Sequence, residues 1–246
     1  MKSFCTALFI VIIASTTSIS HANSYKLLLP SDDQSEFIIH HENYSLGYDE
    51  DTEQAVWVIY EYTKDEANTP PVKRKDKFRP DPSVPTGSAA LSDYKKSGFD
   101  RGHLAPAADM AFSKQAMNES FFMSNMSPQR PRFNRGIWKK LEAKVRSWAR
   151  KDTIIVVTAG ILKGSQHIGK NDVLVPDFYY KVIYVPSKEK AIAFLLPNKA
   201  STAPLKTFVI PIDALEEHTG IDFFPALDDD TENPLEQHPD LADWDW

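Results

Sequence analysis

The segment Asp100-Arg101-Gly102-His103 combines side chains that could act on a phosphate group. A neutral imidazole can take a proton from water near neutral pH, so His103 is a candidate general base. Arg101 can donate two parallel hydrogen bonds to phosphate oxygens, and Gly102 allows the backbone to turn sharply between the two. A single histidine is more often structural than catalytic, so the tetrapeptide alone leaves both interpretations open.

A helix predicted over about residues 134–150 carries two polar side chains on or near its apolar face. At 100° per residue, Asn134 lies at the centre of that face and Glu142 lies about 80° away from it. Asn134 could instead be an N-cap, and Glu142 could pair on the surface with Arg146 or Lys139. The pattern of the helix alone favours these structural roles.

Three segments together change that balance, because they resemble the DNA/RNA non-specific endonuclease family. This family of ββα-metal nucleases includes mitochondrial endonuclease G and secreted bacterial nucleases. The segments are DRGH at residues 100–103, FFMSNMSPQ at 121–129 and FNRGIWKKLE at 133–142. The spacing of His103, Asn125, Asn134 and Glu142 is also similar to that of the family.

The resemblance implies that His103 is the general base for the attacking water and that Asn134 is the one direct protein ligand of a single divalent ion. The ion is expected to be Mg²⁺, with Mn²⁺ or another divalent ion as alternatives, and Glu142 would hold metal-bound water. A helix agrees with this division, because eight residues put the two Cα atoms about 12 Å apart. Mg²⁺ keeps several waters, so one amide ligand is chemically reasonable. Products with a 5′-phosphate are expected.

Other residues acquire roles through the same resemblance. Asn125 resembles a residue that positions the site, Arg101 one that stabilises negative charge on the phosphate, and Arg79 a second phosphate-binding arginine. Asp100 is expected to orient its loop rather than to bind metal. The segment Asp109–Phe112 (DMAF) departs from endonuclease G-like sequences, which bears on substrate preference more than on the reaction.

Charge is distributed unevenly along a chain of 246 residues with a net charge of -6. Residues 64–151 carry 19 basic and 9 acidic side chains, whereas residues 23–63 and 152–246 have net charges of -8 and -9. Such a basic block could be a solvated surface or could line a groove for a phosphate backbone. An acidic total therefore does not exclude DNA or RNA as a partner. The residues expected to bind substrate are Arg79, Arg130, Arg132 and Arg135, with further basic residues upstream at Lys73, Arg74, Lys75 and Lys77.

The first 22 residues have the layout of a secretory signal. Lys2 precedes the apolar run ALFIVIIA at residues 7–14, and Ser20-His21-Ala22 offers small residues for cleavage after Ala22. The run is shorter than the roughly 20 residues that span a bilayer, which argues against a membrane anchor. The protein is expected to be exported, to the periplasm or beyond. Because Cys5 is the only cysteine, the mature chain would have no disulfide and no cysteine-ligated metal.

The order of the elements indicates an α+β protein with a central antiparallel sheet flanked by helices and a ββα-metal active-site motif. Strands are expected at residues 55–62, 153–159, 178–185, 191–196 and 207–212. We expect one nuclease domain over residues 23–225, followed by a loosely ordered acidic tail over 226–246 whose Trp244 and Trp246 could still dock on the body.

These observations favour an exported, metal-dependent endonuclease that hydrolyses DNA, RNA or both without sequence specificity. Two alternatives remain: an inactive relative that only binds nucleic acid, and a phosphodiesterase that acts on small substrates. The sequence leaves open the preferred nucleic acid, the native ion and whether the protein forms a homodimer.

Overall fold

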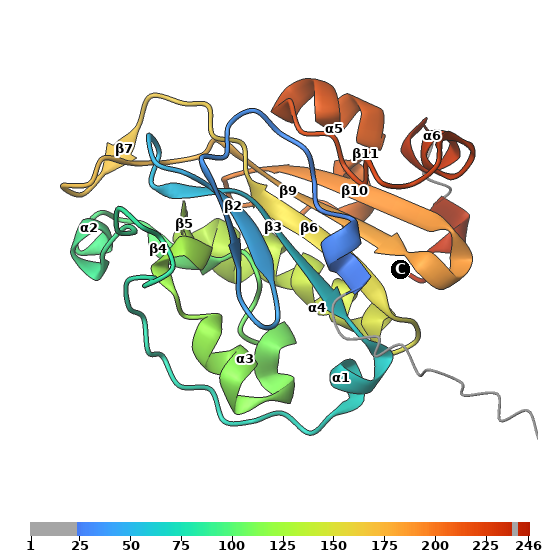
Figure 1. Cartoon of the computed structure of the whole chain (residues 1–246), viewed down its shortest axis with the longest axis horizontal. Helices are drawn as coiled ribbons and strands as arrows, with labels where there is room; N and C mark the ends of the chain where they lie inside the picture. Colours follow the sequence, from blue (N-terminus) through green and yellow to red (C-terminus); the bar gives the residue numbers. More distant parts are fainter. Residues whose placement is uncertain (1–23, 238–240) are drawn as a thin grey trace, which may run out of the picture.

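A seven-stranded antiparallel sheet runs through the computed structural model of the protein, which describes residues 24–237 and 241–246. The strand order is β1-β2-β3-β6-β9-β10-β11, so the central strands come from distant parts of the chain (Figure 1). The strands are β1 Phe37–His40, β2 Ser45–Asp49, β3 Gln54–Tyr62, β6 Ile154–Gly160, β9 Phe178–Val185, β10 Lys190–Pro197 and β11 Val209–Ile210. This architecture confirms the predicted α+β class with a central antiparallel sheet.

The two faces of the sheet are covered by different segments. Because successive side chains of a strand point to opposite faces, neighbouring residues of β9 contact different layers. Tyr179 lies 5.7 Å from the ring of Trp138, which directly precedes helix α4 (Lys139–Ala149). Tyr180 packs at 5.5 Å against Phe223, which follows helix α5 (Ile212–Thr219). Helix α4 therefore covers one face, and the segment around α5 covers the other.

Short helices and strand pairs complete the fold. In Figure 1, α1, α3 and α4 lie on one side of the sheet, and α5 and α6 lie on the other. The additional helices are α1 Lys64–Asn68, α2 Leu91–Tyr94, α3 Lys114–Glu119 and α6 Asp229–Gln237. Two strand pairs stand apart from the main sheet: β4 Asp100–His103 with β5 Met126–Gln129, and β7 His167–Ile168 with β8 Val173–Leu174.

Four of the five predicted strands are confirmed within a few residues, and they are the long apolar ones (β3, β6, β9 and β10). The fifth, expected over residues 207–212, is extended only at Val209–Ile210. A 3₁₀ turn precedes it and α5 starts at Ile212, directly after Pro211, whose ring leaves it no N–H to donate to a sheet. Strands β1 and β2 were not expected, since each offers only four or five residues of weak alternation.

The predicted helix over residues 134–150 is regular only from Lys139. Residues Phe133–Trp138 form a wider, π-helical turn, and Gly136 within it has φ -106° and ψ -110°. Such π-helical turns often occur at functional sites. Asn134 therefore lies in an irregular turn and is not the N-cap of a straight helix.

The C-terminal segment is folded where the sequence predicts a loosely ordered tail. Residues Asp229–Gln237 form α6, and Trp244 is 4% exposed. The ring of Trp244 packs 4.6 Å from that of Trp148 on α4, whose Nε1 donates a hydrogen bond to the carbonyl of Asp245. The sequence left open whether the two C-terminal tryptophans dock on the body. Both rings contact Trp148, and these apolar contacts hold an otherwise acidic segment against the fold.

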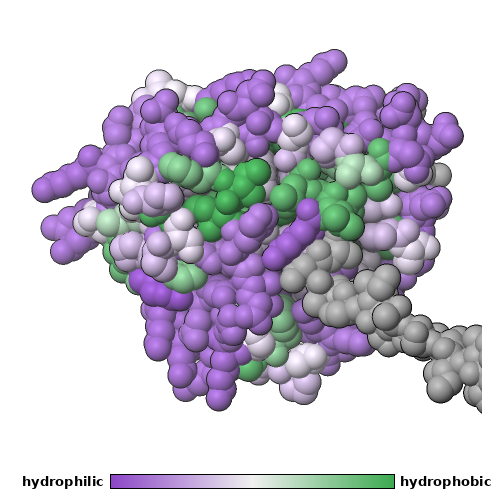
Figure 2. Space-filling model, viewed as in Figure 1, coloured by the Kyte–Doolittle hydropathy of each residue, from purple (hydrophilic) through white to green (hydrophobic). Residues whose placement is uncertain are grey.

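The surface is mostly hydrophilic on the face shown in Figure 2, with hydrophobic residues gathered across its middle. Among the described residues, the large hydrophobic side chains with the greatest exposure come from four separate segments: Leu27, Ile38, Leu91 and Phe178. No helix within residues 24–237 or 241–246 is long and apolar enough to cross a membrane. The predicted signal over residues 1–22 lies outside the described residues.

Trp244→Ala is expected to lower the free energy of unfolding by about 3–5 kcal/mol, because it removes a buried ring from the core. Urea denaturation followed by far-ultraviolet circular dichroism measures this. Leu27→Ala is the control, since Leu27 is 78% exposed and its loss should change stability by less than about 0.5 kcal/mol. Equal stability of the two variants would mean that the C-terminal segment does not pack on α4.

Candidate active site

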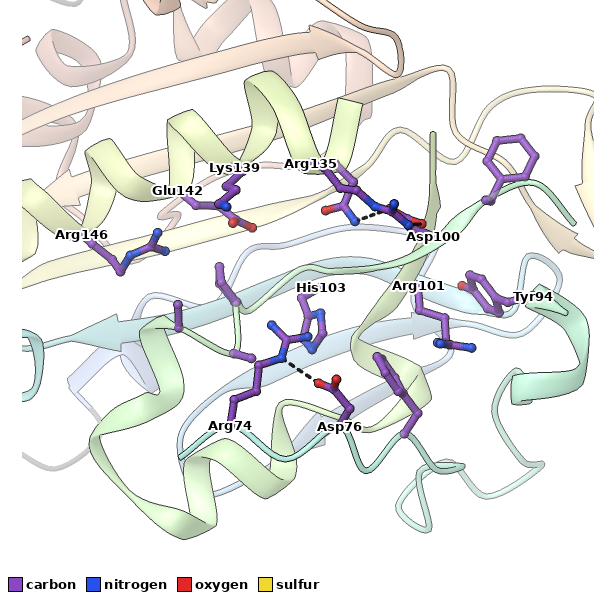
Figure 3. A pocket seen from close by; sticks show the side chains of 16 residues that line it. Arg74, Asp76, Tyr94, Asp100, Arg101, His103, Arg135, Lys139, Glu142 and Arg146 are labelled. Atoms are coloured by element: carbon purple, nitrogen blue, oxygen red, sulfur yellow. Dashed lines mark hydrogen bonds and ion pairs between the residues drawn. The ribbon is translucent and has the colours of Figure 1, made fainter. Parts of the chain in front are cut away.

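A cavity of about 740 Å³ opens between β4, the π-helical turn and α4. It brings together five of the predicted site residues: Arg101, His103, Asn134, Arg135 and Glu142. Figure 3 shows Arg101, His103, Arg135 and Glu142 around the cavity. Five cationic side chains line it against three carboxylates. The cations are Arg74, Arg101, Arg135, Lys139 and Arg146, and the carboxylates are Asp76, Asp100 and Glu142. The cavity thus suits an anionic ligand.

The antiparallel pair β4–β5 presents the DRGH segment to this cavity. In its register Arg101 lies opposite Pro128, and His103 lies opposite Met126. A Cβ atom built at Gly102 would lie 2.2 Å from Cδ of the buried Gln129. Any side chain at this position would therefore displace Gln129 from its place beside the strand.

The imidazole of His103 is held in its neutral form. Its side chain is largely enclosed, with the ring edge-on to Phe121 at 4.9 Å. Burial, reinforced by the positive charges of Arg74 and Arg101, lowers the pKa of His103 to about 3. The imidazole is therefore neutral at neutral pH, as a base must be before it accepts a proton.

The two ring nitrogens of His103 differ in access. Nε2 is enclosed and has no hydrogen-bond partner among the described residues. Nδ1 is not one of these enclosed, unpartnered atoms, and His103 lines the cavity, so Nδ1 is the nitrogen that we expect water there to reach. The tautomer with the proton on Nε2 leaves the Nδ1 lone pair free to accept a proton.

Asn134 is oriented by Asp100. Its Nδ2 donates to Asp100 Oδ2 at 3.0 Å, while Arg135 donates to both oxygens of Asp100 at 2.8 and 2.6 Å. Among the described residues no hydrogen bond engages Oδ1 of Asn134, and an amide oxygen is a ligand that a hard cation accepts. Asp100 thus contacts the side chains of Asn134 and Arg135, whereas the sequence predicts that it orients its own loop.

Glu142 lies on α4, two turns beyond Asn134, and faces the same cavity. Burial raises the pKa of Glu142, whereas the buried ammonium of Lys181 and the guanidinium of Arg146 act in the opposite direction. The surface ion pair with Arg146 that the sequence allowed is not formed, because Arg146 binds another carboxylate. The Glu142 carboxylate thus remains available to a ligand in the cavity.

Arg146 is a lining residue that the sequence analysis did not select. Its Nη1 donates to Asp109 Oδ1 at 2.8 Å, and the hydroxyl of Tyr60 donates to Asp109 Oδ2 at 2.8 Å. Asp109 is 1% exposed, so the carboxylate that holds the Arg146 guanidinium lies inside the protein; we call this buried ion pair the clamp. The spacing held a usable signal, since Arg146 follows Glu142 by four residues and the two share one side of the helix.

Arg74 is the second lining residue that sequence reasoning missed as an individual. It counted only as one of several basic residues upstream of DRGH. In the structure its side chain reaches the cavity next to His103 and donates to Asp76 at 2.7 Å (Figure 3). Nothing in the local pattern distinguishes Arg74 from its basic neighbours.

Three of the predicted substrate-binding arginines do not line the cavity, whereas Arg135 does. Arg79 donates to the carbonyls of Lys77 and Asn118 and lies over the ring of Phe122. Arg130 lies over the ring of Phe99 at 5.4 Å, and Arg132 lines a neighbouring groove. Arg79 is therefore engaged in packing. A second phosphate-binding arginine was predicted at Arg79, and the structure has Arg74 at the cavity instead.

Asn125 does not line the cavity but binds the backbone close to His103. It is fully buried, accepts from the backbone N–H of Ala105 at 2.8 Å, and donates to the carbonyls of Ala105 and Ser120. These bonds hold the chain immediately after His103, which agrees with a positioning role. Arg101 lies over the ring of Phe78 at 4.3 Å, and its Nε has no hydrogen-bond partner in the described part of the chain.

The oxygen donors of the cavity fit a hard divalent cation. The Asn134 amide oxygen and the Glu142 carboxylate come from the turn and helix on one wall, and carbonyl and carboxylate oxygens with water are the ligands that Mg²⁺ accepts. Among the described residues, no cysteine lines the cavity, and His103 is its only imidazole. These oxygen ligands do not suit a soft metal ion, which prefers sulfur ligands.

Comparison with known proteins gives a consistent result. A sequence profile of the family described as "DNA/RNA non-specific endonuclease" matches residues 20–230. The chain is 37% identical over 207 residues to nuclease C1 of Cunninghamella echinulata var. echinulata, covering 76% of this chain and 82% of that protein. It is 35% identical over 204 residues to human mitochondrial endonuclease G, covering 76% of this chain and 69% of that protein.

The fold is similar to that of a solved nuclease as well. A crystal structure of the EndoG/EndoGI complex, from work on the mechanism of EndoG inhibition, contains a chain that superposes with a TM-score of 0.78 at 29% identity. The match covers 87% of this chain and 95% of that one. With its cavity, sequence and fold in agreement, the chain belongs to the DNA/RNA non-specific endonuclease family, whose members are metal-dependent hydrolases of nucleic acid.

Proposed function

We propose that the protein is an exported endonuclease that cleaves phosphodiester bonds of DNA, RNA or both, with His103 as general base and one divalent ion, Mg²⁺ by preference, on Asn134. The observation that carries the proposal is the neutral imidazole of His103 in the same cationic cavity as the oriented amide of Asn134. A base, an oxygen ligand for a cation and several arginines are what hydrolysis of a phosphodiester requires.

The reaction follows from the placement of these groups. Nδ1 of His103 accepts a proton from water as the water oxygen attacks phosphorus. The bond from phosphorus to the 3′-oxygen breaks, and the released 3′-oxygen takes a proton from solvent, which leaves a 5′-phosphate on the other product. A divalent ion held by Asn134, and through water by Glu142, would stabilise the charge that develops on the phosphate and the leaving oxygen.

The arginines around the cavity supply the remaining stabilisation. Arg74 and Arg101 flank His103, and Arg146 is fixed on the α4 side by Asp109. Guanidinium groups bind phosphate oxygens through forked hydrogen bonds, and they do so irrespective of the base attached. This supports cleavage without sequence specificity and binding that weakens as salt concentration rises.

His103→Ala is expected to reduce the cleavage rate of plasmid DNA and of total RNA by about 10²- to 10⁴-fold, because it removes the general base. Gel-shift binding of DNA in the presence of chelator should change little. His167→Ala serves as the matched control, since His167 is exposed on β7 and does not line the cavity. Equal cleavage by His103→Ala and wild-type protein would rule out the assigned role.

Asp109→Asn is expected to lower kcat by about 10- to 100-fold, because it weakens the clamp that fixes Arg146 against the substrate phosphate. Tyr60→Phe is the control, since it removes the other hydrogen bond to Asp109 but leaves the ion pair with Arg146 intact. Its kcat should stay close to the wild-type value.

A double-mutant cycle separates positioning from general destabilisation. If Asp109 acts through Arg146, the variant Asp109→Asn/Arg146→Ala should be no slower than Arg146→Ala alone. Additive losses of kcat in the double variant would contradict a role through Arg146.

Export is part of the proposal and rests on the N-terminal pattern of a basic start, an apolar run and small residues before Asn23. Protein recovered from outside the cytoplasm of a producing cell is expected to begin at Asn23. N-terminal sequencing or intact mass measures this, and a recovered chain that still starts at Met1 would contradict the assigned cleavage site.

A further inference from the structure

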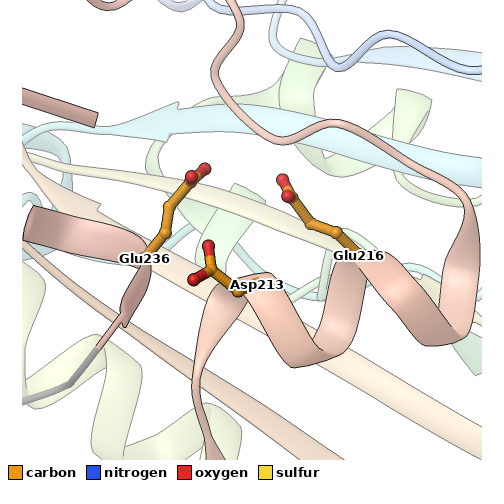
Figure 4. Close-up of side chains that lie close together, drawn as sticks. All are labelled: Asp213, Glu216 and Glu236. Atoms are coloured by element: carbon orange, nitrogen blue, oxygen red, sulfur yellow. The ribbon is translucent and has the colours of Figure 1, made fainter. Parts of the chain in front are cut away.

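Three carboxylates meet on the side of the sheet that faces away from the cavity. Asp213 and Glu216 lie three residues apart on α5, so they share one side of that helix, and Glu236 reaches them from α6. One carboxylate oxygen from each lies within 4.8 Å of the others. Figure 4 shows the three carboxylates around a common space.

The cluster is strongly negative. Besides burial, the main influences on Glu236 are four other carboxylates, those of Asp213, Glu216, Asp222 and Glu232. Carboxylates this close together repel one another when they are ionised, and a cation bound between them would remove that repulsion.

One carboxylate oxygen of the cluster is buried without a hydrogen-bond partner among the described residues. Glu236 is 8% exposed, and its Oε1 has no hydrogen-bond partner among the described residues. Glu216, by contrast, accepts a hydrogen bond from the backbone N–H of Phe223 at 2.7 Å. An enclosed carboxylate oxygen without a partner is costly, so a ligand that contacts Glu236 from within the cluster would be strongly favoured.

We propose that Asp213, Glu216 and Glu236 bind one Ca²⁺ ion that links α5 to α6. Ca²⁺ takes six to eight oxygen ligands at about 2.3–2.6 Å, so two oxygens on one ion can be about 5 Å apart. The separations in the cluster fall within that limit. Asp213 is exposed, which leaves room for water to complete the coordination.

Other ions suit this cluster less well. Mg²⁺ binds oxygens at about 2.0–2.1 Å in a strict octahedron and retains its waters, so it would require the three side chains to close up. Zn²⁺ favours nitrogen and sulfur ligands, and the three members of the cluster supply only carboxylates. The site is separate from the catalytic cavity, whose lining residues include none of the three.

The ion would act on the C-terminal segment. Helix α6 contacts β10 and α5, and further along the chain Trp244 packs on Trp148 of α4. A cross-link between α5 and α6 would therefore hold the start of a segment whose end packs on the helix that carries Glu142 and Arg146. The role is structural and does not depend on the proposed catalytic mechanism.

The test compares the full mature protein, stripped of metal with chelator, with the variant Asp213→Asn/Glu216→Gln. Calorimetric titration with CaCl₂ should show one more Ca²⁺ bound by the wild-type protein than by the variant. At a calcium concentration about a hundredfold above the dissociation constant, the Tm of the wild-type protein should rise by about 5 °C or more, and that of the variant by much less. Equal concentrations of MgCl₂, and NaCl of matched ionic strength, should not reproduce the full shift.

Glu217→Gln is the matched control, because it makes the same chemical change on α5 at an exposed position outside the cluster. It should bind Ca²⁺ as the wild-type protein does. The cluster variant should fold well, since without calcium it lacks the repulsion and its Tm should equal or exceed that of the wild-type protein. The same calcium stoichiometry in the wild-type protein and cluster variant, or no calcium-specific rise in Tm, would overturn the proposal.

Discussion

The hydrogen bond from Asn134 to Asp100 joins the two halves of the active site. Asp100 begins the strand that ends at His103, and Asn134 lies in the turn that leads into α4. The bond and the forked contact of Asp100 with Arg135 fix the strand that carries His103 relative to the turn that carries Asn134. The Arg135 side chain is 73% exposed, so this ion pair adds little to stability and its value lies in orientation.

Beneath α4 the core departs from ordinary packing. Lys181 is fully buried in the middle of β9, its Nζ has no hydrogen-bond partner among the described residues, and it lies 5.0 Å from the ring of Trp138. Burial lowers the pKa of Lys181, while Glu142 and Asp109 favour its charged form. The carboxylates of Glu142 on α4 and of Asp109 before α3 offset part of the cost of burying this charge. Such departures from an apolar core are expected where a site needs fixed charges at low dielectric.

The sequence was sufficient for the parts of the fold that repeat a simple pattern. Continuous apolar runs located β3, β6, β9 and β10, and the spacing within three motifs located His103, Asn134 and Glu142. It was insufficient where long-range contacts decide the outcome. Strands β1 and β2 are short and depend on pairing with β3, and the tail depends on the contact of Trp244 with Trp148.

The selection of arginines shows the same limit. Arg74 and Arg79 occur in one basic stretch with similar neighbours, yet only Arg74 reaches the cavity. The difference arises from the carbonyls of Lys77 and Asn118, which hold the Arg79 guanidinium in place, and these meet only in the folded chain. Arg146 likewise depends on Asp109, which lies 37 residues earlier in the sequence. The composition of a basic stretch can therefore indicate a phosphate-binding surface. It cannot identify which of its arginine side chains reach the cavity.

The division of charge along the sequence becomes a division of surfaces in the fold. The middle of the chain, with its excess of basic residues, forms β4, the π-helical turn and α4, and these enclose the cavity. The acidic C-terminal part forms α5 and α6 on the opposite face of the sheet. At physiological ionic strength charges on exposed surfaces are screened over about 8 Å, so the acidic face has little effect on a polyanion at the cavity. The net charge of -6 is thus compatible with a nucleic-acid substrate, because the substrate responds to the local field and not to the total.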